Sequence, residues 1–320
     1  MSESEEPPSQ SSYLTLAGSG AAAAPSRTRQ MLAFAVIYTV WGSTYLAIRV
    51  GVETIPPFLM AGTRFALAGG LLFGFLRASG VTAPTRVEWR HATVAGLAML
   101  TVGNGLVTWA EQRVPSSLAA LLVAAVPLYT ALLDWWRPGG RRPQPMVLAG
   151  IVIGFGGMVL LVLPDPSAIT VHSTAGVIAV LISALGWSIG SLYARYAIRH
   201  RHAAMVSAQH MLTGGAALLV AGLCRGEGAR LSPSAISGHS ALAFAYLTVF
   251  GSLLAFSVFG WLVVVSTPAR VSTTAYVNPV VAVILGWLLL DETLAPRALA
   301  GAALIIVAVM VMTLGQLRRR

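Results

Sequence analysis

One arginine lies inside an apolar stretch, where a charged side chain is costly. Arg64 lies about seven residues into the segment 57–77, and a guanidinium at the centre of a bilayer costs about 2.5–3.5 kcal/mol on insertion scales. Its planar fork can bind a carboxylate or a phosphate through two parallel hydrogen bonds. Two roles are therefore open for Arg64. It could hold an anionic ligand, or it could be a structural cation paired to Glu53, Glu111 or backbone carbonyls.

Aromatic and amide side chains also occur deep in apolar segments, where they could line a binding site. Trp41 and Trp187 lie about halfway along their segments, away from the interfaces that tryptophan usually occupies in membrane proteins. Asn104 lies between two glycines, which allow a close approach or a local break of the backbone. The alternative for the rings is ordinary helix packing. The candidate cavity residues are Trp41, Tyr45, Arg64, Asn104, Trp187, Tyr193, Tyr276 and Asn278.

Two prolines and two titratable residues complete the set of candidates. Pro127 and Pro279 lie within apolar segments, where each removes a backbone donor and frees a carbonyl one turn earlier. We predict that both act as hinges, although neighbouring groups could recapture the freed carbonyls. Proton-coupled carriers place Asp, Glu or His at membrane depth. Asp134 and His210 are therefore candidates for proton coupling, unless Asp134 is only an interfacial residue among arginines.

The sequence Gly186-Trp187-Ser188-Ile189-Gly190 spells the G-x-S-x-G motif of a serine hydrolase, and His210 lies on the next apolar segment. That motif normally needs a strand, a sharp turn and a helix. Here it runs through one apolar segment, where two glycines four residues apart favour close helix packing. No zinc-protease motif, His/Cys cluster or P-loop is present, so the sequence predicts neither a metal nor a cofactor.

The composition predicts a membrane protein. Apolar residues make up 56% of the chain and charged residues 10%, with a mean hydropathy of +0.75, well outside the range of soluble domains. All 21 basic residues are arginine. They lie between apolar segments rather than on one soluble face, which argues against a nucleic-acid partner. Residues 1–30 are acidic, then rich in Ser, Pro and Ala, so we expect a disordered cytoplasmic tail.

Ten apolar segments are long enough to cross a membrane, and helices are expected because lipid offers the backbone no hydrogen bonds. Alternate loops carry fifteen and five arginines, so the positive-inside rule places both termini in the cytoplasm of a multi-pass protein of the cytoplasmic membrane. The expected spans are 31–50, 57–77, 91–111, 116–136, 145–163, 173–195, 203–224, 240–264, 269–290 and 296–316.

The spans repeat in two halves. Pro145-x-x-Leu-Ala-Gly150 recurs as Pro296-x-x-Leu-Ala-Gly301, and Trp41 recurs as Trp187. Two copies with an odd number of spans must be inverted relative to each other, as in many transporters. The predicted fold is therefore an all-α integral membrane protein with ten transmembrane helices in two inverted five-helix repeats, 31–163 and 173–316.

Pairs of glycines four residues apart predict close helix contacts. They are Gly70 with Gly74, Gly150 with Gly154, and Gly186 with Gly190. One of these pairs could face a second protomer, so a homodimer stays open.

The amino-acid sequence of several segments resembles that of the EamA-type branch of the drug/metabolite transporter superfamily, over residues 31–316. The resemblance rests on Trp41-Gly-Ser-Thr-Tyr-Leu-Ala-Ile-Arg49, Pro56-Pro-Phe58, Arg64-Phe65 and Asp291-Glu292-Thr-Leu-x-Pro296. It implies a ten-helix carrier of small metabolites that works by alternating access. The first four helices of each half would surround the cavity, and the fifth would be peripheral. One departure is that Arg137-Pro-Gly-Gly-Arg141 replaces the Gly-Glu that usually follows the fourth span.

Together these features predict a secondary active or facilitative transporter that exports small metabolites, amino acids or drugs. Its partners would be a small-molecule substrate and the lipid bilayer. The alternatives are a passive channel or membrane sensor, for which an acidic ring or a receiver domain is missing, and an intramembrane serine hydrolase. Uniport, exchange and proton antiport all stay open.

Overall fold

Every regular element in the described part of the chain is helical. The computed structural model describes residues 26–140, 142–162, 173–197, 202–266, 271, 274–292 and 295–317. The helices of the first half are α1 (Arg27–Gly51), α2 (Pro57–Ala78), α3 (Arg86–Gly96), η1 (Leu97–Asn104), α4 (Gly105–Ala110), α5 (Ser116–Val123), α6 (Val126–Trp136) and α7 (Pro145–Val162). Those of the second half are α8 (Thr174–Ala197), α9 (Ala203–Cys224), α10 (Glu227–Arg230), η2 (Pro233–Ala235), α11 (Gly238–Tyr246), η3 (Leu247–Leu254), α12 (Ala255–Val265), α14 (Thr274–Leu290) and α15 (Pro296–Leu317).

Seven helical segments among the described residues are long and apolar enough to cross a membrane. They are Arg27–Gly51, Pro57–Ala78, Arg86–Ala110, Ser116–Trp136, Thr174–Ala197, Ala203–Cys224 and Gly238–Leu262. Three shorter apolar helices, Pro145–Leu160, Val277–Leu290 and Leu299–Met312, accompany them. The prediction of a helical membrane protein is confirmed, whereas the total of ten spans stays a prediction.

The first helix starts slightly earlier than its predicted span. The backbone N–H of Arg29 donates a hydrogen bond to the Ser26 hydroxyl at 3.3 Å, so Ser26 is an N-cap and the helix begins at Arg27 instead of residue 31. Residues 1–25 of the predicted tail lie outside the described residues.

Two helical spans contain a π-helical segment at matching places. The segments η1 and η3 are each eight residues long and start 150 residues apart, at Leu97 and Leu247. A π-helix is rare and is frequently found at functional sites. The distance along the chain agrees with that between the repeated sequence motifs. Both segments adjoin the cavity described below.

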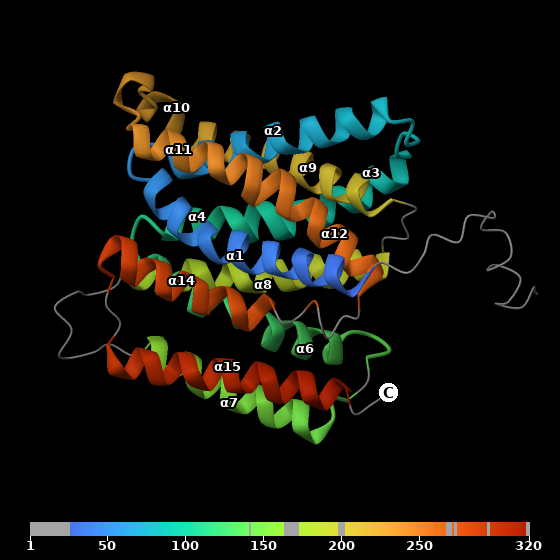
Figure 1. Cartoon of the computed structure of the whole chain (residues 1–320), viewed down its shortest axis with the longest axis vertical. Coiled ribbons are helices and arrows are strands. Elements are labelled where there is room, and N and C mark those ends of the chain that lie inside the picture. Colours follow the sequence, from blue (N-terminus) through green and yellow to red (C-terminus); the bar gives the residue numbers. More distant parts are fainter. Residues whose placement is uncertain are drawn as a thin grey trace, which may run out of the picture.

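Helices from the two halves pack in antiparallel pairs (Figure 1). The helices α2 and α9 lie side by side at one edge of the bundle, and α7 and α15 lie at the opposite edge. Glycines allow the first pair to approach closely: a Cβ atom at Gly69 would lie 2.9 Å from the Leu212 nitrogen, and one at Gly215 would lie 2.7 Å from the Ala66 nitrogen. The sequence Gly69-Gly70 of the first half recurs as Gly214-Gly215 in the second half, and Gly69 and Gly215 both lie where α2 and α9 cross.

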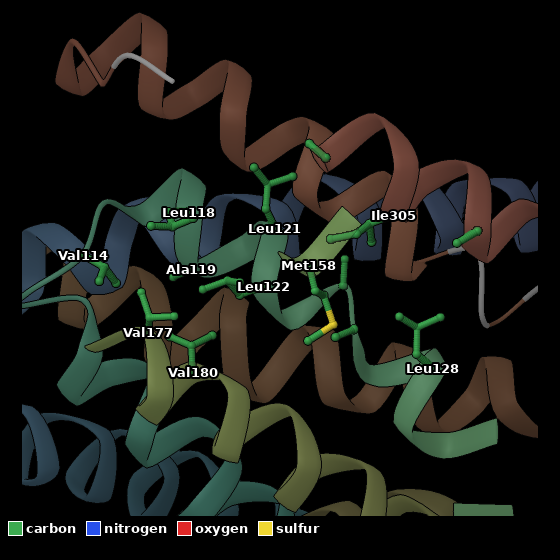
Figure 2. Close-up of a cluster of buried hydrophobic side chains, with 14 of the residues drawn as sticks. Val114, Leu118, Ala119, Leu121, Leu122, Leu128, Met158, Val177, Val180 and Ile305 are labelled. Atoms are coloured by element: carbon green, nitrogen blue, oxygen red, sulfur yellow. The ribbon is translucent and has the colours of Figure 1, made fainter. Parts of the chain in front are cut away.

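The second pair contributes to a large apolar cluster, part of which is drawn in Figure 2. Leu118, Leu121 and Leu122 of α5 contribute to a buried cluster with Val180 of α8 and Ile305 of α15. Because lipid tails are as apolar as these side chains, van der Waals packing rather than release of water stabilises such a cluster in a membrane. This cluster holds the peripheral pair α7 and α15 against the helices around the cavity.

The glycine pairs differ in what they contact. A Cβ atom at Gly150 would lie 2.8 Å from the Ala308 carbonyl oxygen of α15, and one at Gly186 would lie 2.7 Å from Val102 Cγ1. Both pairs that contain these residues therefore serve packing inside the chain. Gly70 and Gly74 of α2 are exposed, and a Cβ atom on either would have nothing within 4 Å among the described residues.

Candidate functional site

A cavity of about 160 Å³ lies between helices of the two halves. A buried water needs at least about 10–15 Å³ on this scale, so the cavity has room for a small organic molecule. Among the described residues its lining comes from both halves, and neither α7 nor α15 contributes. The predicted residues that line it are Trp41, Tyr45, Arg64, Asn104, Trp187, Asn278 and Pro279.

Arg64 brings hydrogen-bond donors to this cavity. Its side chain is buried, with 2% exposed, and Nη2 donates to Asn104 Oδ1 at 3.1 Å. Nε and Nη1 are buried and have no hydrogen-bond partner among the described residues. A buried donor without a partner costs free energy, and a bound anion could accept bonds from both nitrogens.

The structural pairings considered for Arg64 are not formed as salt bridges. Among the described residues, neither Glu53 nor Glu111 has a carboxylate oxygen within 4.0 Å of an Arg64 nitrogen. Glu53 is exposed, whereas Glu111 is fully buried and its charge attracts that of Arg64 from further away. The bond with Asn104 therefore orients Arg64 and leaves two of its nitrogens available.

Two asparagines place side-chain amide oxygens, which accept hydrogen bonds, at the cavity. Asn104 ends the π-helical segment η1, and its carbonyl accepts a hydrogen bond from Thr108 Oγ1 at 2.9 Å. Asn278 lies on α14, and its buried Oδ1 has no hydrogen-bond partner among the described residues. The cavity thus offers unused donors at Arg64 and an unused acceptor at Asn278, a combination that suits a ligand with an anionic group and a donor group.

An aromatic cluster forms one wall of the cavity. The ring of Trp41 lies 6.4 Å from that of Trp187 at 87°, 5.5 Å from Phe256 and 4.9 Å from Phe259, measured between centroids. Trp41 Nε1 donates to the Gly251 carbonyl in η3 at 3.3 Å. Sequence reasoning did not identify Phe256 and Phe259, because a phenylalanine in an apolar helix has no polar signal that marks it.

Both predicted hinge prolines lie beside the cavity. Pro279 lies within α14 and lines the cavity, and Pro127 follows Val126, which also lines it. Before Pro127 the span is interrupted between α5 and α6, where the Ala125 N–H donates to the Leu122 carbonyl at 3.1 Å. Pro279 cannot donate to the carbonyl of Ala275, which lines the cavity. Pro127 lies in the first turn of α6, where an N–H has no acceptor within the helix.

Besides Pro127, three predicted residues lie outside the cavity lining. The Tyr193 hydroxyl is 2.7 Å from His91 Nδ1. Asp134, whose side chain is 39% exposed, accepts hydrogen bonds from Arg137 Nε and the Tyr196 hydroxyl, both at 2.7 Å. His210 is buried on α9, where its backbone packs against α3. The side chain of Tyr276, on α14, lies outside the described residues.

Glu292 joins the two halves at one end of the bundle. Its Oε1 accepts hydrogen bonds from the backbone N–H and the hydroxyl of Ser116, at 2.8 and 2.9 Å. Its Oε2 accepts bonds from the corresponding groups of Ser117, at 2.9 and 2.6 Å. The N-cap of α5 is Pro115, which has no side-chain oxygen. The second half therefore caps this first-half helix, where the helix dipole favours a negative charge.

Glu227 repeats this arrangement at the start of α2. The N-cap of α2 is Pro56, and the N–H of Leu59 donates to Glu227 Oε2 at 2.9 Å. Sequence analysis identified Glu292 as part of a family motif but not as a cap. A helix that begins after a proline lacks a capping side chain of its own, and this can be seen in the sequence. The sequence does not show which distant residue supplies the cap.

The serine of the hydrolase-like motif is occupied by structural hydrogen bonds. Ser188 is fully buried in the continuous helix α8, and its hydroxyl donates to the carbonyls of Ala184 at 2.8 Å and Val126 at 3.1 Å. Gly190 packs against α3, because a Cβ atom there would lie 3.0 Å from the Ala95 carbonyl. These contacts are those of a packing face. No group of three or more potential metal ligands occurs among the described residues.

Comparison with known proteins identifies related membrane transporters. Residues 29–163 and 174–314 each match the EamA-like transporter family. The uncharacterized inner membrane transporter YedA of Escherichia coli (strain K12) is 40% identical over 295 residues, which cover 91% of this chain and 94% of YedA. The uncharacterized transporter YoaV of Bacillus subtilis (strain 168) is 24% identical and covers 91% of this chain.

A crystal structure is similar over nearly its whole length. The TM-score is 0.61 at 23% sequence identity, and the match covers 92% of this chain and 99% of that chain. This likeness shows a shared fold.

Proposed function

Since this chain belongs to the EamA-like transporter family, we propose that it is a ten-helix secondary carrier that exports small metabolites, amino acids or drugs by alternating access. The observation that carries the proposal is the cavity between the two halves, where buried donors of Arg64 and the buried Asn278 Oδ1 have no partner among the described residues. Its partners are a small-molecule substrate and the lipid bilayer. We place it in the cytoplasmic membrane, with both termini inside.

Several features support two inverted five-helix repeats, 31–163 and 173–316. The helix α2 runs antiparallel to α9, and α7 runs antiparallel to α15 (Figure 1). The π-helical segments η1 and η3 occur 150 residues apart. In a carrier built this way, the substrate binds near the middle of the membrane where the repeats meet.

Alternating access requires two groups of helices that separate at one end at a time. We propose that one group contains α1, η3, α12 and α14, and the other α3, η1, α4, α5, α6 and α8. Their side-chain hydrogen bonds to each other meet at the end where α1 and α14 terminate (Figure 1). Glu292 accepts such bonds from Ser116 and Ser117 of α5. In addition, Arg49 Nη1 donates to the Glu111 carbonyl, and Gln112 Nε2 donates to the Val52 carbonyl at 3.4 Å.

The other end of the bundle has a different pattern in the described residues. The bonds between His91 and Tyr193, and between Asp134 and Tyr196, join helices of the same group. Because the arginine tally assigns this end to the cytoplasm, the structure corresponds in our proposal to a carrier closed toward the outside. Pro127 and Pro279 would be the hinges of the transition.

The test is metabolite profiling of cells with and without the protein, at equal membrane abundance of all variants. We expect specific solutes to accumulate in the medium of cells that express the natural protein. Asn278→Leu removes the unused acceptor and should abolish this accumulation. Gly70→Ala is the matched control, because a Cβ atom there meets nothing within 4 Å. Identical profiles with and without the protein would contradict the export proposal.

A further inference from the structure

Glu111 is a buried carboxylate that the predicted site does not include. It follows α4, its side chain has 0% exposure, and neither Oε1 nor Oε2 has a hydrogen-bond partner among the described residues. A carboxylate in such a position is costly in its charged form unless cations compensate for the lost water. The residue is therefore suited to gain and lose a proton.

The groups that face Glu111 come from three directions. Tyr45 and Arg49 lie on α1, Arg64 lies on α2, and Glu292 follows α14. Arg49 Nη1 also donates to the backbone carbonyl of Glu111, which holds this cation beside the carboxylate. Tyr45 and Arg64 line the cavity, so the charge of Glu111 acts on two groups that a ligand would contact.

When Glu111 is ionised and the cavity holds no ligand, the charges of this cluster balance. Arg49 and Arg64 contribute two positive charges, and Glu111 and Glu292 contribute two negative charges. Glu292 is fixed by four hydrogen bonds to Ser116 and Ser117. An anion bound at Arg64 would add a charge that nothing in the cluster compensates. Protonation of Glu111 restores the balance, because electrostatic interactions are strong where water is excluded.

We propose that Glu111 is the proton-binding residue of this carrier, and that one anion bound at Arg64 is accompanied by one proton on Glu111. The inference rests on the proposed function in that the anion is cargo. The reaction is simple protonation: the Glu111 carboxylate takes a proton from hydronium in the solution and becomes a neutral carboxyl group, while the anion replaces it as the counter-charge of Arg64. Anion and proton then occupy the same state of the carrier.

The geometry favours Glu111 over the two residues predicted from sequence. Asp134 is 39% exposed and bonded to Arg137 and Tyr196, outside the cavity lining. His210 lies on α9, which contributes no residue to the cavity lining within the described chain. Of the three, Glu111 is the residue whose charge acts directly on Arg64.

The first test measures protonation without a ligand. Purified protein in lipid is studied by infrared difference spectroscopy between acidic and alkaline pH. We expect a protonated carboxyl band that disappears at alkaline pH in the natural protein and is missing in Glu111→Gln. The exposed Glu53→Gln is the matched control and should keep the band. A band that persists unchanged in Glu111→Gln would overturn the proposal.

A paired variant tests the electrostatic link to Arg64. Arg64→Gln removes one cation, so the carboxyl band should persist to more alkaline pH or the variant should lose membrane abundance. Arg64→Gln combined with Glu111→Gln removes one charge of each sign and should restore abundance. A double variant less abundant than both single variants would contradict the link.

The second test counts protons with benzoate as the anionic probe. Calorimetric titration in two buffers of different ionisation enthalpy should show about one proton taken up per benzoate bound. Glu111→Gln should bind benzoate with no proton uptake. Absence of benzoate binding, or equal uptake in both proteins, would overturn the coupling. Failure of the carrier proposal looks different: the infrared band titrates as expected, but cells export no solute.

Discussion

At the scale of single residues, the buried polar groups of the cavity are the features that packing does not explain. Arg64 is oriented by Asn104 and keeps two donors without partners among the described residues. Hydrogen bonds to a charged group contribute about 1.5–3 kcal/mol, so a ligand that completes them gains affinity. This argument applies to ligands with a carboxylate or phosphate and leads to a selective prediction.

Arg64→Gln should weaken transport of anionic and zwitterionic substrates by roughly ten-fold or more, corresponding to about 1.4 kcal/mol or more. Neutral substrates should be moved at nearly the original rate, because their binding does not use the guanidinium charge. Transport assays at equal membrane abundance check this, with the exposed Arg113→Gln as control. An equal loss for both substrate classes would indicate a structural role.

Ser188→Ala separates a carrier from an enzyme. The hydroxyl donates to the carbonyls of Ala184 and Val126, so its loss should lower the stability by about 1 kcal/mol. Transport should be retained. Thermal unfolding and transport are the measurements, and loss of an esterase activity in this variant would instead support the hydrolase.

At the scale of helices, the first half depends on the second for its caps. The helices α2 and α5 both begin after a proline that cannot cap them, and Glu227 and Glu292 supply the missing acceptors. Counterparts of these acids are missing on the other side, where Arg137-Pro-Gly-Gly follows α6. This asymmetry ties the halves together at one end of the bundle.

Glu292→Gln should open this end. An amide has a single acceptor oxygen and no charge, so it loses two of the four bonds and the favourable interaction with the start of α5. Ala120 of α5 lines the cavity. In the Glu292→Gln variant with Cys224→Ser, a cysteine introduced by Ala120→Cys should react several-fold faster with an impermeant maleimide added outside. Asp291→Asn is the control, because Asp291 is exposed with a φ of 53° and asparagine tolerates this conformation. An unchanged labelling rate would contradict the role of Glu292.

Pro279→Ala tests the hinge in α14. Alanine restores the N–H that can bond to the Ala275 carbonyl, which stiffens the helix beside the cavity. Transport should become several-fold slower at equal abundance. Pro296→Ala is the control because Pro296 is the first residue of α15, where proline removes no helical hydrogen bond. Full activity of the Pro279 variant would exclude this residue from the mechanism.

At the scale of the whole molecule, we propose that the cavity lies between two similar halves with opposite orientations. The antiparallel pairs α2 with α9 and α7 with α15 place matching helix starts at opposite ends (Figure 1). The start of α7 and the start of α15 should therefore face opposite sides of the membrane, although their sequences are similar.

Single cysteines at positions 144 and 295 test this topology in intact cells, again without Cys224. We expect an impermeant maleimide added outside to label position 295 and not position 144. After permeabilisation both positions should react. Labelling of both from the same side would rule out the inverted repeat and, with it, the proposed alternating access.

The sequence alone determined that this is a helical membrane protein. The length of the apolar segments and the placement of arginines decide directly whether and how a segment inserts into a membrane, and repeated motifs are visible in the sequence itself. It also identified most of the polar and aromatic residues around the cavity, since a polar group in an apolar helix is costly wherever the helix lies. Three-dimensional packing decided the rest. Phe256, Glu111 and the caps from Glu227 and Glu292 depend on which distant helices meet. Such contacts arise from side-chain complementarity between distant helices of the bundle. A pattern of residues along the chain does not indicate which helices these are.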